Sequence, residues 1–203
     1  MSALPQIMIA PNGARHTKAD HPALPITVDE TIATAKACFK AGADGLHMHL
    51  RDESGNHLLD HGLYREAVQE LSCAVPQMAV QITTEAVGIY KPKQQMQIAL
   101  KSGATLVSAS IRELMRGQDE KATAQFYQTA ADQGIFIQHI LYDLSDLDLL
   151  KATLPKRLYT AQSLQLLFVL GKYGQPNSAP EKSLDVYLKQ MKLDQTKLGG
   201  LCF

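Results

Sequence analysis

The sequence predicts an α/β protein of the (β/α)8 barrel type that is incomplete at its C-terminal end. Short apolar runs rich in Val, Ile and Leu alternate with longer segments of helical periodicity, which is typical of a parallel sheet covered by helices. The runs recur at about 31 residues, the length of one barrel unit. A chain of 203 residues therefore holds roughly six and a half units, fewer than a closed barrel needs.

The expected strands are short and end at polar residues or turns. The first covers residues 6–10 and ends at the turn sequence PNG, and the second covers residues 45–50. The other four are expected over residues 78–83, 105–110, 135–141 and 164–171.

The expected helices lie between these strands. The first begins at Thr27, which has the capping-box spacing to Glu30, and it ends at Gly42. The later helices are expected over about 62–73, from near Pro92, over 119–133 before Gly134, after Ser145, and over 183–194.

An open doubly wound sheet is the alternative architecture. Its dinucleotide-binding version is disfavoured because no GxGxxG follows the first strand. The end of the chain, TKLGGLCF, resembles the approach to a seventh strand that stops before it is paired. We therefore expect residues 1–203 to form a single barrel domain that is the N-terminal part of a longer one, with strand edges left open.

Composition excludes several classes of function. Lys plus Arg and Asp plus Glu both number 20, and no basic cluster interleaved with aromatic residues occurs, so neither a nucleic acid nor a membrane surface is an expected partner. An odd number of cysteines, 3, and the absence of a signal sequence or a long apolar run predict a cytoplasmic protein. Small molecules are the expected partners.

The segment GLHMHLRDESG carries the clearest chemical signal. His47 and His49 are two residues apart on an expected strand, so their side chains share one face, where imidazole nitrogens suit zinc. A catalytic zinc usually takes three protein ligands. The candidates for the third are His139, which is placed first, and Glu85, Asp52 and Asp143, whereas His57 and His61 are expected on the loop surface.

Other polar residues gather where strands end, which is the active-site edge of an α/β barrel. Arg15 could bind a carboxylate or phosphate, and Thr83 and Ser108 could donate to an oxyanion. Arg112 could bind such an anion too, but a surface ion pair with a neighbouring acid such as Glu113 is favoured for it. Further candidates at these strand ends are Asn12, Glu85, Ser110 and His139.

Five segments together resemble the family of β-keto acid cleavage enzymes (3-keto-5-aminohexanoate cleavage enzyme-like). They are APNGARHTKADHPALPIT, AGADGLHMHLRDESG, VQITTEAVG, IQHILY and FVLGKYG, in this order. The resemblance implies a TIM barrel, usually a homo-oligomer such as a tetramer, with one divalent metal, normally zinc. It also implies exchange of acyl groups between a β-keto acid and acetyl-CoA, which releases acetoacetate.

The resemblance also assigns residues. The family's two metal-binding histidines match His47 and His49, and its hydroxyls that contact the keto acid match Thr83 and Ser108. Arg15 stands where members that act on the 5-amino substrate have a glutamate. A cation cannot hold an ammonium group, so the expected substrate has an anionic or neutral polar tail.

The family's third metal ligand and its proton-abstracting aspartate and arginine are expected beyond Phe203. We therefore expect the chain as given to bind metal weakly and to have little activity. Two alternatives stay open. One is a non-catalytic barrel fragment that associates through its open edge, and the other is a metal-dependent aldolase or hydrolase that uses His139 as a ligand.

Overall fold

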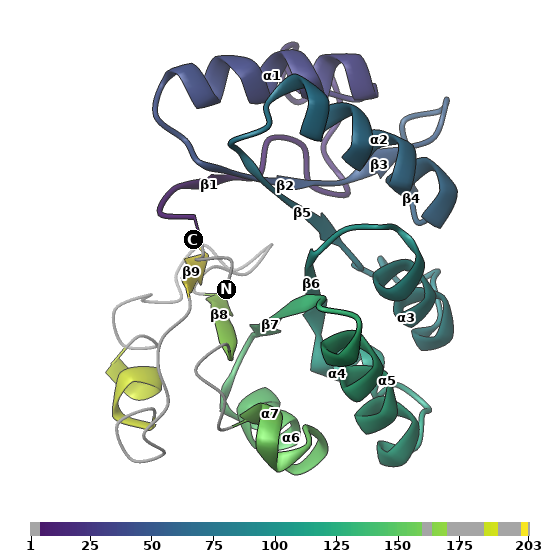
Figure 1. Cartoon of the computed structure of the whole chain (residues 1–203), viewed down its shortest axis with the longest axis vertical. Helices are drawn as coiled ribbons and strands as arrows, with labels where there is room; N and C mark the ends of the chain where they lie inside the picture. Colours follow the sequence, from purple (N-terminus) through teal and green to yellow (C-terminus); the bar gives the residue numbers. More distant parts are fainter. Residues whose placement is uncertain (1–4, 160–163, 170–184, 191–199, 203) are drawn as a thin grey trace.

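The computed structural model describes residues 5–159, 164–169, 185–190 and 200–202. Its main feature is one seven-stranded sheet in the order β1-β2-β5-β6-β7-β8-β9 (Figure 1). The strands are β1 (Met8–Ile9), β2 (Gly45–Met48), β5 (Ala79–Thr83), β6 (Leu106–Ser110), β7 (Phe136–Leu141), β8 (Gln165–Val169) and β9 (Gly200–Cys202).

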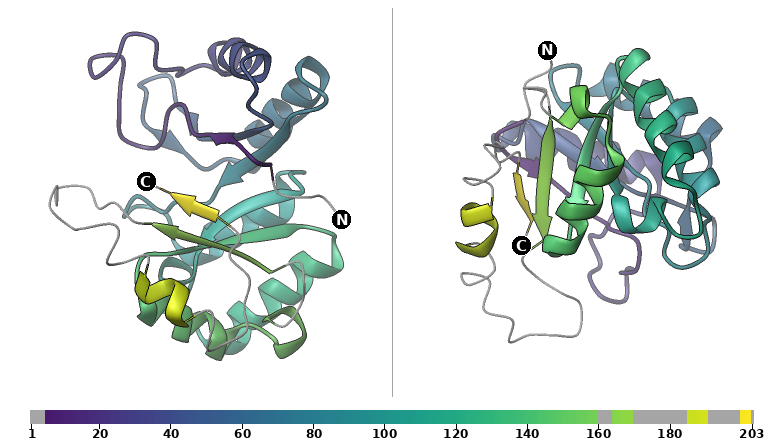
Figure 2. Two further views of the ribbon diagram at one scale, coloured as in Figure 1. Left: turned by 90° about the vertical axis from the view of Figure 1, so that its left-hand side faces the viewer. Right: turned by 90° about the horizontal axis from the view of Figure 1, so that it is seen from below.

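All six pairings in this sheet are parallel, and the strands lie side by side in chain order. The sheet is curled, with the main helices along its outer side (Figures 1 and 2). This is the wall of an incomplete barrel, as predicted. One expectation was wrong: the strand near the chain end is paired, because β9 lies parallel to β8 with Leu167 opposite Gly200.

Four of the helices that cover the sheet, α1, α2, α5 and α6, begin at side-chain caps. Thr27 accepts the amide of Glu30, and the Glu30 carboxylate accepts the Thr27 amide, so the predicted capping box is confirmed. The helices are α1 (Val28–Lys40), α2 (His61–Ala74), α3 (Pro92–Lys101), α4 (Ile111–Leu114), α5 (Glu120–Asp132), α6 (Leu144–Thr153) and α7 (Lys156–Tyr159).

The last predicted elements are only partly covered by the described residues. Residues 185–190 are helical, whereas the rest of the expected helix and the last two residues of the strand expected over 164–171 lie outside the described ranges. Within those ranges, no helix is both long and apolar enough to cross a membrane.

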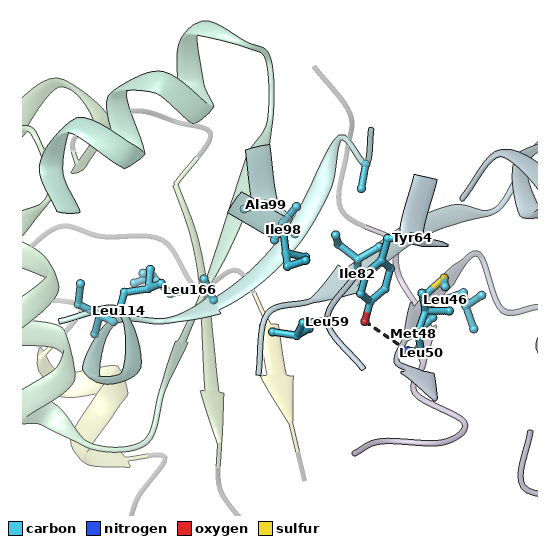
Figure 3. Packing of buried hydrophobic residues seen from close by; sticks show 14 of the residues in the cluster. Leu46, Met48, Leu50, Leu59, Tyr64, Ile82, Ile98, Ala99, Leu114 and Leu166 are labelled. Atoms are coloured by element: carbon cyan, nitrogen blue, oxygen red, sulfur yellow. Dashed lines mark hydrogen bonds between the residues drawn. The ribbon is translucent and has the colours of Figure 1, made fainter. Parts of the chain in front are cut away.

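The hydrophobic core lies between the sheet and its helices. Leu46 and Met48 of β2 and Ile82 of β5 are buried and lie close to Tyr64 of α2 (Figure 3). The Tyr64 hydroxyl accepts a hydrogen bond from the Leu50 amide at 3.3 Å. Because successive side chains of a strand point to opposite faces, the residues between these apolar ones point into the barrel interior.

A short hairpin that the sequence did not predict follows β2. Its strands, β3 (Leu50–Arg51) and β4 (His57–Leu58), pair antiparallel, with Arg51 opposite His57. The turn is shaped by Asp52, whose Oδ1 accepts the amides of Ser54 and Asn56. The hairpin returns the chain toward the end of β2.

We predict that Leu46→Ala lowers the free energy of unfolding by about 2–5 kcal/mol, because it leaves a cavity in this core. Leu46 is fully buried, whereas Ile7 is 58% exposed and serves as the control. Ile7→Ala should change stability by less than about 0.5 kcal/mol. Urea unfolding of both variants measures this, and equal effects would contradict the packing described.

Candidate functional site

His47 and His49 lie together on the interior face at the end of β2, as their spacing predicts. The Nε2 atoms of the two rings are 3.1 Å apart. Leu46 and Met48, which alternate with them, point to the helices and are buried. Two imidazole nitrogens therefore converge on one point of the interior.

A hydrogen-bond chain fixes the ring of His47. Its Nδ1 lies 2.7 Å from Oε1 of Gln81 in β5, and Nε2 of Gln81 donates to Oε1 of Gln138 in β7 at 3.1 Å. Because the Gln81 amide nitrogen faces Gln138, its oxygen accepts from Nδ1–H of His47, and the lone pair of His47 is on Nε2. Burial lowers the pKa of His47 and favours its neutral form.

His49 is held by its backbone. The side chain of Asn12 donates to the His49 carbonyl at 2.8 Å and accepts the His49 amide at 3.3 Å. Burial, together with the neighbouring ring of His47, holds the pKa of His49 well below its usual value. Its Nδ1 is buried and makes no hydrogen bond within the part of the chain that the structure describes.

Glu85 follows β5 and lies beside this pair. Its Oε1 is 2.8 Å from Nη1 of Arg15, and its Oε2 is 4.0 Å from Nδ1 of His49. The side chain of Glu85 is 23% exposed and that of Arg15 is 54% exposed, so the ion pair lies at the solvent-facing side of the site. Arg15 thus lies at the edge of the site.

His57 is a site neighbour that the sequence analysis missed. It was expected on the loop surface, but the β3–β4 hairpin buries it with its ring centroid 5.1 Å from that of His49. Its Nε2 lies 3.0 Å from the carbonyl oxygen of Glu85. The turn-like sequence DESGN was the signal for this hairpin. His61 is exposed, as expected.

Arg51 shapes the loop that carries Asn12 and Arg15. Its Nη2 donates to the carbonyls of Asn12, Gly13 and His16 at 2.6 to 3.0 Å. Its Nη1 donates to the carbonyl of Gly55 in the hairpin turn at 2.8 Å. The guanidinium therefore joins the loop after β1 to the hairpin after β2.

The predicted hydroxyl groups share the interior face. Thr83 of β5 is paired with Ser108 of β6, and Ser108 with Gln138 of β7. Thr83 Oγ1 accepts the Glu85 amide at 3.0 Å. The Oγ atoms of Ser108 and Ser110 are buried, and neither has a hydrogen-bond partner among the described residues.

The structure does not bring His139 to this site. His139 is paired with Ala109 and lies next to Gln138, whose side chain points inward, so His139 points to the helices. Its ring packs on Tyr127 of α5, with centroids 5.2 Å apart, and both line a cavity of about 150 Å³. Burial lowers the pKa of His139 to about 3.

Two other acids that the sequence offered as metal ligands, Asp52 and Asp143, have structural roles instead. Asp52 forms the hairpin turn, and Asp143 caps α6 and accepts from Nη2 of Arg112 at 2.7 Å. Arg112 also pairs with Asp146 at 2.7 Å and lies 4.9 Å over the Tyr142 ring. Arg112 thus forms an ion pair as expected, but with Asp143 and Asp146 and not with Glu113, whose carboxylate accepts from Gln95.

The histidine pair supplies two of the ligand atoms that a metal site needs, but not a complete set. The two Nε2 atoms converge, and the tautomer of His47 leaves its Nε2 able to coordinate. Over the described ranges, however, no group of three or more His, Cys, Asp or Glu side chains is arranged to hold a metal. Glu85 and His139, both candidates for a third ligand, do not complete such a group.

The comparison with known families covers most of the chain. The family model for beta-keto acid cleavage enzymes matches residues 6–197. A 3-keto-5-aminohexanoate cleavage enzyme of Acetoanaerobium sticklandii is 25% identical over 175 residues, which cover 83% of this chain and 63% of the relative. A 3-oxoadipate:acetyl-CoA acetyltransferase of Cupriavidus necator is 30% identical over 78 residues, which cover 38% of this chain and 28% of the relative.

Solved structures with a similar fold include barrel enzymes. A type I 3-dehydroquinate dehydratase of Clostridium difficile matches with a TM-score of 0.64 at 11% identity, over 98% of this chain and 75% of that one. A ternary complex of ObcA matches with a TM-score of 0.55 at 16% identity, over 73% of this chain and 37% of that one. At such identities these likenesses concern the fold alone.

The burial of His139 predicts a loss of stability in acid. Its pKa is about 3 in the folded chain but about 6.5 in the unfolded chain, so below about pH 6.5 only the unfolded state gains the proton. The free energy of unfolding should fall by up to about 1.4 kcal/mol per pH unit from this group. His139→Leu removes the titration, so between about pH 7 and pH 4 it should lose roughly 3 kcal/mol less than the wild type.

Urea unfolding across this pH range tests the prediction, with His61→Leu as the control because His61 is exposed. The control should follow the wild-type profile. A His139→Leu profile parallel to the wild type would contradict the buried, neutral state of His139.

Proposed function

Because the chain belongs to the beta-keto acid cleavage enzyme family, we propose that it carries the metal-binding and substrate-binding half of an acyltransferase site. In this proposal a β-keto acid and acetyl-CoA give acetoacetate and a new acyl-CoA. The observation that supports it most is the convergence of Nε2 of His47 and His49, 3.1 Å apart on the interior face. A homo-oligomer, such as a tetramer, is part of the same proposal.

The histidine pair would hold a divalent metal, which we propose is zinc. Zinc bound there would polarise the ketone oxygen and stabilise the negative charge that develops as the carbon–carbon bond breaks. Gln81 keeps the proton of His47 on Nδ1, which leaves Nε2 available as a ligand. With two protein ligands among the described residues, metal affinity should be lower than that of a three-ligand site.

The hydroxyls of β5 and β6 would orient the keto acid. The Thr83 oxygen already accepts the Glu85 amide, so its own proton can be donated to a substrate oxygen. The Ser108 hydroxyl is buried without a partner among the described residues, which is unfavourable unless a ligand group satisfies it. Together they would position a carboxylate or the developing oxyanion.

Arg15 would select the tail of the substrate. Its guanidinium is about half exposed at the site edge and can form a bidentate pair with a carboxylate. The name of the Cupriavidus necator relative specifies 3-oxoadipate, which has two carboxylates. We therefore propose a dicarboxylic β-keto acid rather than the 5-amino substrate.

A second candidate is a chain without activity of its own that associates through the open edge of its sheet. The observation in its favour is that the described residues supply only two metal ligands. The metal titration below separates the two candidates.

We predict that the 203-residue protein binds about one zinc ion per chain. His47→Ala or His49→Ala should weaken zinc binding more than about tenfold, because even the loss of a group that only hydrogen-bonds to a metal ligand weakens metal binding by about that factor. Competition with a chromophoric chelator measures the affinity. The exposed histidine variant His61→Ala is the control and should bind as the wild type does. Zinc affinity that is unchanged in both site variants would sink the proposal.

The substrate prediction concerns exchange of labelled acetyl groups from acetyl-CoA. Exchange with a dicarboxylic β-keto acid should exceed exchange with 3-keto-5-aminohexanoate. Arg15→Gln should slow exchange with the dicarboxylic acid by about tenfold, because it removes one charged contact worth about 1.4 kcal/mol. Comparable exchange with both substrates would refute the assignment of Arg15. Lys18→Gln, a change of another exposed cation in the same loop, is the matched control.

A further inference from the structure

We propose that Glu85 is a carboxylate shared between Arg15 and His49, so that anion binding at Arg15 tightens metal binding at His49. An anion that binds Arg15 would replace Glu85 as its partner, and the Glu85 carboxylate could then turn toward Nδ1 of His49. This inference rests on the proposed function, because it takes His49 as a metal ligand and Arg15 as the anion site. It adds a positioning role for Glu85 and a linkage between the two ligands.

The backbone of Glu85 is fixed on both sides. Its amide donates to Oγ1 of Thr83 at 3.0 Å, and its carbonyl oxygen lies 3.0 Å from Nε2 of the buried His57. The side chain therefore starts from a fixed point between the loop of Arg15 and the histidine pair. A rotation of the side chain alone can move its carboxylate from one partner to the other.

The two oxygens of Glu85 are used unequally. Oε1 is in a short pair with Nη1 of Arg15 at 2.8 Å, whereas Oε2 is 4.0 Å from Nδ1 of His49, which is beyond a hydrogen bond. Nδ1 of His49 is buried and makes no hydrogen bond with any described residue. In the metal-free pair the proton of His49 is on Nε2, which lies 3.1 Å from the lone pair on Nε2 of His47. A metal bound to both Nε2 atoms would move this proton to Nδ1, and a carboxylate that moves closer would then accept from it.

The position of Glu85 suits it to hydrogen-bond to a metal-binding histidine rather than to bind the metal itself. Oε2 approaches Nδ1 of His49, while Nε2 of the same ring faces Nε2 of His47. A carboxylate that accepts from the far nitrogen of a ligating imidazole sets its tautomer and makes it a stronger ligand. Gln81 has this role for His47, and His49 lacks a partner of the same kind among the described residues.

Arg15 competes with His49 for the same carboxylate. A substrate carboxylate on Arg15 weakens the pair between Arg15 and Glu85, which leaves Glu85 available to His49. Metal and anion would then each raise the affinity of the protein for the other by the same factor, as linkage requires. The metal would be held most tightly when the substrate is present.

Zinc affinity of the full chain, with and without glutarate as the dicarboxylate probe, tests the proposal. Glutarate should tighten zinc binding to the wild type by about fivefold or more, which is the usual range of coupling between sites. Glu85→Gln should weaken zinc binding by about tenfold or more and remove the glutarate effect. Arg15→Gln should tighten zinc binding without glutarate and should also remove the glutarate effect.

The double variant Arg15→Gln/Glu85→Gln separates a shift of Glu85 from simple loss of positive charge. If Glu85 transmits the effect, Arg15→Gln tightens zinc binding in the wild type but not in the Glu85→Gln background. Glu53→Gln, which removes an exposed acid of the hairpin turn, is the charge control and should behave as the wild type does.

The outcomes separate this inference from the proposed function. If zinc binding depends on His47 but is equal in Glu85→Gln and the wild type, the shared carboxylate is wrong and the metal site remains. A glutarate effect that persists in Arg15→Gln has the same meaning. No zinc binding to the wild type overturns both.

Discussion

The strict alternation of side chains along β2 is the constraint on which the site depends. Leu46 and Met48 are buried in the core beneath the helices, and this forces His47 and the following His49 into the interior. Parallel pairing in chain order then places Gln81, Thr83 and Ser108 on the same interior face. A shift of β2 by one residue would exchange the two sets and lose the core and the site together.

Local patterns predicted most of the fold, because helix periodicity, capping and turn residues act over a few positions. The capping box at Thr27 and the shared face of His47 and His49 are examples. Contacts that depend on distant segments were beyond such patterns. The ion pair of Arg15 with Glu85 joins residues 70 positions apart, and the burial of His57 depends on a hairpin packing beside β2.

The position of His139 shows a second limit. Two adjacent polar residues, Gln138 and His139, occupy the middle of β7, and only one of them can face the interior. The register with β6 and the contact of Gln138 with Gln81 decide in favour of Gln138. The sequence alone could not supply this register. The resemblance in sequence indicated the family correctly. The structure places the predicted candidate Glu85 beside the histidine pair and adds His57 and Arg51 to its surroundings.

Metal binding by the histidine pair depends on the tautomer of His47, because its Nε2 can join His49 in binding a metal only if it carries a lone pair. Nitrogen-15 NMR of the histidine side chains measures this directly in the metal-free protein. The hydrogen bond to Gln81 predicts that His47 carries its proton on Nδ1, and that Gln81→Leu removes this preference. A His47 ring protonated on Nε2 in the wild type would contradict the account.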